Sequence, residues 1–225
     1  MRDLIRQEQF ELEVLDRLNS GRFLERLVFG GGTMLRLCHG LDRFSVDLDF
    51  WLLPGTADGT REEKVDRWFD RLKQYLARYY KIRDAMDKFY TLVFELRSTS
   101  YPRSLKLEMR KKMEIRGTDQ AIAYSPHSTV QVLVQTLSLQ EMMASKIEAF
   151  LDRGEIRDAY DLEFLVKRGL KAAISRDKAN RVVSAIESLT PRDYNVKLGS
   201  LLEADQRAYY REKNFAILKE AMADI

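Results

Sequence analysis

One stretch between residues 27 and 53 constrains the fold more than any other part of the chain. It reads LVFGGGTMLRLCHG and, five residues later, VDLDFWLL. The opening LVF is compatible with a short buried strand, and glycines allow the sharp turn that follows it. Met34, Leu35 and Leu37 have the spacing of a helix that stops near Gly40, and VDLDFWLL alternates as a second strand does. The stretch therefore predicts a strand, glycine turn, helix and strand within an α/β (α+β) fold.

The rest of the chain divides into a mixed part and a helical part. Apolar periodicity predicts helices over 4–18 and 61–80, and β-rich runs predict strands over 88–97, 104–112 and 129–139. After that the pattern changes to helices only, over 139–153, 157–169, 177–189 and beyond Pro191. We expect an α/β part over residues 1–137 and a helical part over 138–225.

Composition sets broad limits on the class of protein. The 225 residues are 45% hydrophobic and 32% charged, with a net charge of +3, which neither requires nor excludes a nucleic-acid partner. The single cysteine, Cys38, cannot form an intramolecular disulfide. The charged N-terminal segment does not resemble a signal peptide, and no apolar run approaches the ~20 residues of a membrane span. We expect a cytoplasmic protein without membrane contact.

The glycine turn is a candidate anion site. A turn that leads into a helix exposes unpaired backbone N–H groups, which favour phosphate. Gly31 and Gly32 would supply such groups, and the Thr33 hydroxyl would add a donor. The turn is neither GxGxxG nor a P-loop, so those two nucleotide-binding folds are disfavoured. Glycine pairs also occur in purely structural turns, and that interpretation stays open.

Two aspartates follow on the next predicted strand. Alternate residues of a strand share a face, so Asp47 and Asp49 lie side by side. Neighbouring carboxylates repel each other unless a cation lies between them, and Mg²⁺ prefers such oxygens. Glu108, within LKLEMR, is a candidate third ligand. The alternative is that all three acids face water on an exposed strand, although apolar neighbours around the aspartates argue against it.

These residues resemble a known family. The glycine turn, the aspartate strand and a later acidic strand are similar to the DNA polymerase β-like nucleotidyltransferase superfamily, and within it to the AbiEii/AbiGii toxin group. That group has GGTxL followed by RxSxDhDh, matched here by Arg43, Ser45, Asp47 and Asp49. A downstream helix with a lysine, then RD and a further aspartate, is matched by Lys146, Arg157, Asp158 and Asp161. Many superfamily members have serine after the first glycine, whereas this chain has the Gly-Gly-Thr usual in the toxin group.

The resemblance implies an activity and partners. The implied fold is a polymerase β-like mixed sheet with helices, followed by a helical C-terminal part. The implied reaction moves a nucleoside monophosphate from an NTP to an acceptor and releases pyrophosphate, with Mg²⁺, one ion or two, as cofactor. The implied role is the toxin of a type IV-like toxin–antitoxin or abortive-infection system in phage defence. RNA, in particular a tRNA 3′ end, is the implied acceptor, and a DNA-binding antitoxin encoded alongside is the implied partner.

The resemblance also implies residue roles. Asp47, Asp49 and Glu108 would hold metal, and Glu108 could also accept the acceptor's proton. Gly31, Gly32 and Thr33 would bind the β and γ phosphates, and Lys146 would add a positive charge. Arg43 and Ser45 would orient phosphate or brace the loop. Asp158 and Asp161 would position Lys146 or contact the nucleotide, unless they only stabilise a helix N-terminus.

Other functions remain compatible with the same residues. A polymerase β-like enzyme could modify a small molecule or a protein hydroxyl, and a non-catalytic module could bind nucleotide without transfer. Paired buried acids are costly without a metal, which argues against the non-catalytic alternative. His39, His127 and Cys38 are interpreted as structural.

Overall fold

The computed structural model describes residues 2–54, 64–111 and 115–225. The chain forms two compact units. The sheet unit comprises residues 1–40 and 44–137, and the helical unit comprises residues 41–43 and 138–225.

The sheet unit is built on one mixed sheet of seven strands in the order β3-β4-β5-β2-β1-β7-β6. Two neighbouring pairs, β1–β7 and β2–β5, are parallel, and the other pairs are antiparallel. The predicted mixed α/β fold is thereby confirmed. The strands are β1 (Leu27–Gly30), β2 (Asp47–Leu52), β3 (Lys81–Asp87), β4 (Thr91–Arg97), β5 (Leu105–Arg110), β6 (Thr118–Ala123) and β7 (Val132–Leu137).

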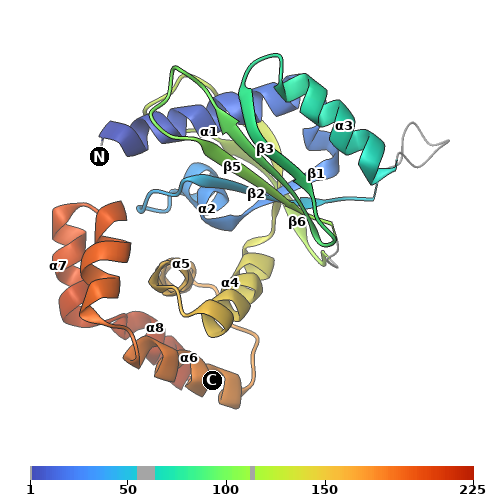
Figure 1. Ribbon diagram of the computed structural model, residues 1–225. Coiled ribbons are helices and arrows are strands. Elements are labelled where there is room, and N and C mark those ends of the chain that lie inside the picture. Colours follow the sequence, from blue (N-terminus) through green and yellow to red (C-terminus); the bar gives the residue numbers. More distant parts are fainter. Residues whose placement is uncertain (1, 55–63, 112–114) are drawn as a thin grey trace. The chain divides into compact units, whose positions relative to one another are not determined.

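Two helices cover one face of this sheet. Figure 1 shows α1 (Arg2–Ser20) and α3 (Val65–Leu76) on the same side of it. The Tyr75 hydroxyl of α3 donates to the Arg17 carbonyl of α1 over 2.9 Å, and the Phe69 ring packs 4.9 Å from that of Phe94 on β4. The strands turn their buried residues, among them Leu48 and Phe50, into this core. Because side chains alternate along a strand, Asp47 and Asp49 point to the opposite face.

The helical unit contains α4 (Leu139–Arg153), α5 (Ile156–Lys167), α6 (Arg176–Glu187), α7 (Ala204–Lys213) and α8 (Ala216–Ala223), with a π-helical turn (Asp193–Leu198) and a short 3-10 turn (Gly199–Leu201). Local sequence signals fix the ends of α4. The Ser138 hydroxyl accepts a hydrogen bond from the Glu141 backbone N–H over 3.2 Å, and Gly154 ends the helix in the left-handed conformation.

The strands β3 and β6 fall on segments for which the sequence predicts no regular element. Both lie at the edges of the sheet and carry mostly exposed or half-buried residues, so neither has the apolar alternation that predicts a strand. The strand expected over 88–97 begins only at Thr91, because the Lys88 N–H donates to the Thr91 carbonyl in a turn. The helix expected over 61–80 is α3, and residues 61–63 lie outside the described residues. No described helix is both long and apolar enough to cross a membrane.

Candidate active site

The glycine turn is tightly joined to the aspartate strand. Strand β1 leads directly into α2 (Gly31–His39), and Gly31 has a φ of +74°, in the left-handed region. A Cβ at Gly31 would overlap the Asp49 carboxylate and come within 2.9 Å of the Asp49 Cβ. Glycine is therefore required here for its backbone conformation and because the Asp49 side chain fills the space beside it.

Strand register brings the third acid to the same place. On the parallel strands β2 and β5, Asp49 lies opposite Glu108 and Asp47 lies opposite Lys106. On the other side of β2, Asp49 lies opposite Gly30 at the start of α2. Neighbouring strands are about 4.8 Å apart, so Asp49 and Glu108 share one face of the sheet beside a helix N-terminus. The half-buried carboxylates are hard oxygen donors of the kind that Mg²⁺ prefers.

Lys106 modifies this acidic group. Its Nζ lies 2.6 Å from Glu108 Oε2. The hydrogen bond to Glu108 raises the pKa of Lys106, and the charges of Asp47 and Asp49 add to the effect although partial burial opposes it. Within the described ranges, no three His, Cys, Asp or Glu side chains converge as a metal cage. Sequence reasoning missed Lys106, although the alternation in LKLEMR places it on the same strand face as Glu108.

Thr33 has a partner within the protein. Its side chain is buried, and its hydroxyl donates to the Asp47 carbonyl over 2.5 Å. This bond ties α2 to the start of β2, on which the aspartates lie. Ser45 is half-buried in the segment that leads into β2.

A buried polar group on α1 was also missed by sequence reasoning. Glu8 pairs with Arg36 of α2 and accepts from the Ser125 hydroxyl. Glu11 is fully buried, and in the part of the chain that the structure describes neither of its carboxylate oxygens has a hydrogen-bond partner. Burial raises the pKa of Glu11 well above its ordinary value, and the negative charges of Glu8 and Asp47 raise it further. The helical periodicity of α1 gave no signal of this group, because acids on an amphipathic helix are expected to face water.

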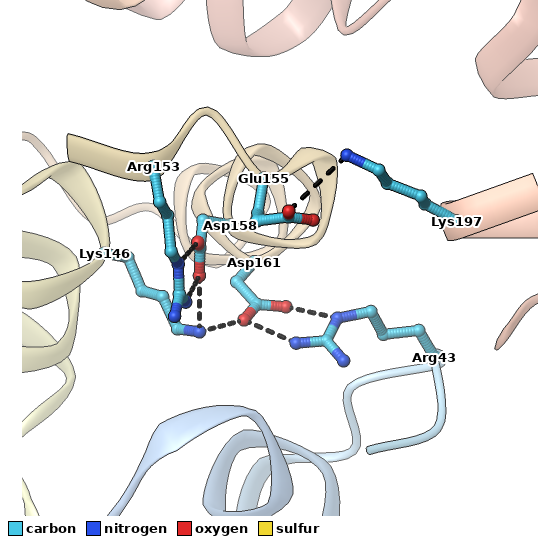
Figure 2. A network of polar contacts seen from close by, with 7 residues as sticks. All are labelled: Arg43, Lys146, Arg153, Glu155, Asp158, Asp161 and Lys197. Atoms are coloured by element: carbon cyan, nitrogen blue, oxygen red, sulfur yellow. Dashed lines mark hydrogen bonds and ion pairs between the residues drawn. The ribbon is translucent and has the colours of Figure 1, made fainter. Parts of the chain in front are cut away.

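The remaining predicted residues form a continuous ion-pair network in the helical unit (Figure 2). Arg43 donates to both Asp161 oxygens over 2.7 Å, and Lys146 Nζ lies 2.5 Å from Asp161 Oδ2. Lys146 also lies 3.0 Å from Asp158, to which Arg153 donates over 2.7 and 2.8 Å. Arg43 and Asp161 are buried, with 3% and 0% of their side chains exposed. The predicted residues thus fall into a set in the sheet unit and a set in the helical unit.

Electrostatics keep this network charged. Burial would raise the pKa of Asp158, but Lys146 and Arg153 hold it below its ordinary value. Burial would lower the pKa of Arg43, and Asp161 more than offsets this, so the pKa rises. The phosphate-binding roles of Arg43 and Lys146 remain predictions, since in this structure both cations are paired with aspartates.

Cys38 has the environment of a structural residue. The thiol is half-buried, and its partial desolvation raises its pKa to about 12, which disfavours the reactive thiolate.

Comparison with protein families decides the identity. The model described as "Nucleotidyl transferase AbiEii toxin, Type IV TA system" matches residues 13–221. The chain belongs to the AbiEii nucleotidyltransferase toxin family. As an AbiEii protein it is a nucleotidyltransferase with a role in a type IV toxin–antitoxin system, in which an antitoxin is its partner. The match covers the glycine turn, the aspartate strand and the ion-pair network alike.

Solved structures share the AbiEii fold. A crystal structure of a candidate nucleotidyltransferase from Helicobacter pylori superimposes with a TM-score of 0.57 at 19% identity, covering 96% of each chain. JHP933 from Helicobacter pylori gives a TM-score of 0.54 at 19% identity, over 96% of this chain and 93% of that one. At 19% sequence identity, these two matches show a shared fold and nothing more specific. A comparison with curated proteins gives no significant match.

Proposed function

We propose that this AbiEii protein transfers a nucleoside monophosphate from an NTP to an acceptor hydroxyl and releases pyrophosphate, with Mg²⁺ as cofactor. The observation that supports this most directly is the strand register that sets Asp49 opposite Glu108 and against Gly31, at the N-terminus of α2. Acidic oxygens for a metal and backbone N–H groups for phosphate then belong to one surface of the sheet unit.

The reaction follows from what these groups can do. Asp47, Asp49 and Glu108 would hold Mg²⁺. The bound ion would neutralise negative charge on the triphosphate. The backbone N–H groups of Gly31 and Gly32 would bind phosphate oxygens. The acceptor oxygen attacks the α-phosphorus, the bond to the bridging oxygen of the β-phosphate breaks, and pyrophosphate leaves. A Glu108 carboxylate oxygen accepts the proton of the acceptor hydroxyl.

RNA, and in particular the 3′ end of tRNA, is the acceptor that we favour. Support comes from the toxin family to which the chain belongs, since a toxin that extends tRNA ends would stop translation. A small molecule or a protein hydroxyl is the alternative acceptor.

Labelled nucleotide incorporation tests the proposal. Purified protein is incubated with Mg²⁺, each α-labelled NTP in turn and total tRNA, and label in RNA is measured on a gel. We expect incorporation by the wild type and a loss of about 100-fold or more with Asp49→Ala, because charge stabilisation in the transition state is lost. Asp70→Asn, an exposed acid on α3, is the matched control and should keep full activity.

The outcomes of this assay separate the alternatives, and a growth assay adds to them. Label on a small molecule or on protein, with none on RNA, would replace the acceptor. NTP binding without transfer to any acceptor would favour a non-catalytic module. Equal activity of Asp49→Ala and the wild type would contradict the assigned site. Growth arrest on induced expression, present for the wild type and absent for Asp49→Ala, would connect the activity with toxicity.

A further inference from the structure

Lys106 is the basic side chain that the fold places among the proposed metal ligands. It lies two residues before Glu108 on β5, so both side chains point to the same face of the sheet. Across the parallel pairing Lys106 lies opposite Asp47, and its Nζ is 2.6 Å from Glu108 Oε2. The ammonium therefore holds an oxygen that the proposed function gives to a metal.

The charge balance of this face depends on Lys106. Asp47, Asp49 and Glu108 bring three negative charges to neighbouring positions of two strands, and like charges this close destabilise one another. The Lys106 ammonium compensates one of them. A divalent cation neutralises more negative charge than the ammonium does, and it also prefers carboxylate oxygen. Lys106 and the metal ion therefore compete for the Glu108 carboxylate.

We propose that Lys106 is a built-in counter-ion of the acidic site, which occupies Glu108 in the absence of metal and is displaced when a divalent cation binds. This inference rests on the proposed function, because it takes the same three acids as metal ligands. In this role Lys106 neutralises part of the negative charge of this face without metal and lowers the affinity for free metal.

The solvent exposure of the Lys106–Glu108 ion pair determines how strongly Lys106 lowers the affinity for metal. The side chains of Lys106 and Glu108 are 47% and 27% exposed. Ion pairs exposed to this degree change an equilibrium by about fivefold at most. Removal of Lys106 also removes the repulsion between its ammonium and a nearby divalent cation, which increases the gain in metal affinity. Lys106 therefore weakens metal binding without preventing it, and its removal should tighten binding about three- to tenfold.

Titration with Mn²⁺ tests the inference without any turnover. Free Mn²⁺ is measured by electron paramagnetic resonance for the wild type, Lys106→Met and the charge-conserving Lys106→Arg, with circular dichroism to verify folding. We expect about three- to tenfold tighter binding for Lys106→Met and a change of less than about twofold for Lys106→Arg. In a Glu108→Gln background, Lys106→Met should gain less, since the negatively charged carboxylate for which the two cations compete is gone.

The outcomes distinguish this inference from the proposed function. Mn²⁺ affinity of folded Lys106→Met equal to or weaker than that of the wild type would overturn the counter-ion role and leave the metal site intact. If neither folded protein bound Mn²⁺ at millimolar concentration, the proposed metal site itself would be overturned, and the counter-ion role with it.

Discussion

At the scale of the residue, the site depends on a few side chains whose environment is set by their immediate neighbours. Gly31 leaves room for Asp49, Thr33 ties α2 to the Asp47 backbone, and Glu11 is buried without a hydrogen-bond partner among the described residues. Each of these arrangements makes a substitution informative, because one defined interaction changes.

Gly31→Ala should reduce both stability and activity. An alanine at positive φ costs about 1–2 kcal/mol, and its Cβ would in addition displace the Asp49 carboxylate. We expect nucleotide incorporation to fall by more than about tenfold. Gly154→Ala is the matched control, because Gly154 has a φ of +63° and no atom within 4 Å of the added Cβ. Urea unfolding should show a loss of stability in both variants, and only Gly31→Ala should lose incorporation. Full activity of Gly31→Ala would contradict the close packing of Asp49.

Glu11→Gln should stabilise the protein at alkaline pH. The raised pKa of Glu11 favours the neutral acid, so its contribution to wild-type stability is fully present below the unfolded pKa and is lost as pH rises through the folded pKa. An amide does not ionise, and it avoids this loss. Since an unsatisfied buried group costs about 1–3 kcal/mol, we expect a Tm several degrees above that of the wild type at pH 8 and a smaller difference at pH 5. Glu25→Gln, at an exposed position, should show no such trend, and a difference independent of pH would disprove the explanation.

At the scale of the element, α5 is notable for the acids that it buries. Helix α5 buries three acids, Asp158, Asp161 and Glu163, beside its apolar residues. The first two are neutralised by Arg43, Lys146 and Arg153, and Glu163 pairs with Lys167 and accepts from the Leu218 N–H near the start of α8. A helix with this many buried acids is stable only if basic side chains pair with those acids.

Asp161→Asn should therefore destabilise the helical unit. The substitution leaves Arg43 and Lys146 with one negative partner fewer in a buried environment, and breaking a buried pair costs about 3–5 kcal/mol. Asp177→Asn, in the exposed first turn of α6, is the control and should change stability by less than about 0.5 kcal/mol. A stable Asp161→Asn variant that has lost nucleotide incorporation would instead place Asp161 in the chemistry.

At the scale of the whole molecule, the chain divides between two units, and the division is not simple in sequence. Residues 138–225 form the helical unit together with Leu41–Arg43, a segment between α2 and β2 whose neighbours on both sides belong to the sheet unit. The Arg43 pair with Asp161 joins residues 118 positions apart in sequence. A motif that reads as one continuous run from the glycine turn to the aspartates thus contributes to both units.

The mixed α/β fold, the strand–glycine–helix–strand order and the family were predictable from the amino-acid sequence, because local periodicity, turn residues and short motifs carry that information. Alternation alone put Asp47 and Asp49 on one face. Four features were not predictable and became visible in the folded chain: Glu108 lies opposite Asp49, Lys106 pairs with Glu108, Arg43 pairs with Asp161, and Glu11 is buried. Strand register and long-range ion pairs depend on which distant segments meet, and polar edge strands such as β3 and β6 carry no apolar pattern to reveal them. A charged group can be buried at low cost only when oppositely charged side chains from distant segments pair with it. The local sequence does not predict those pairings.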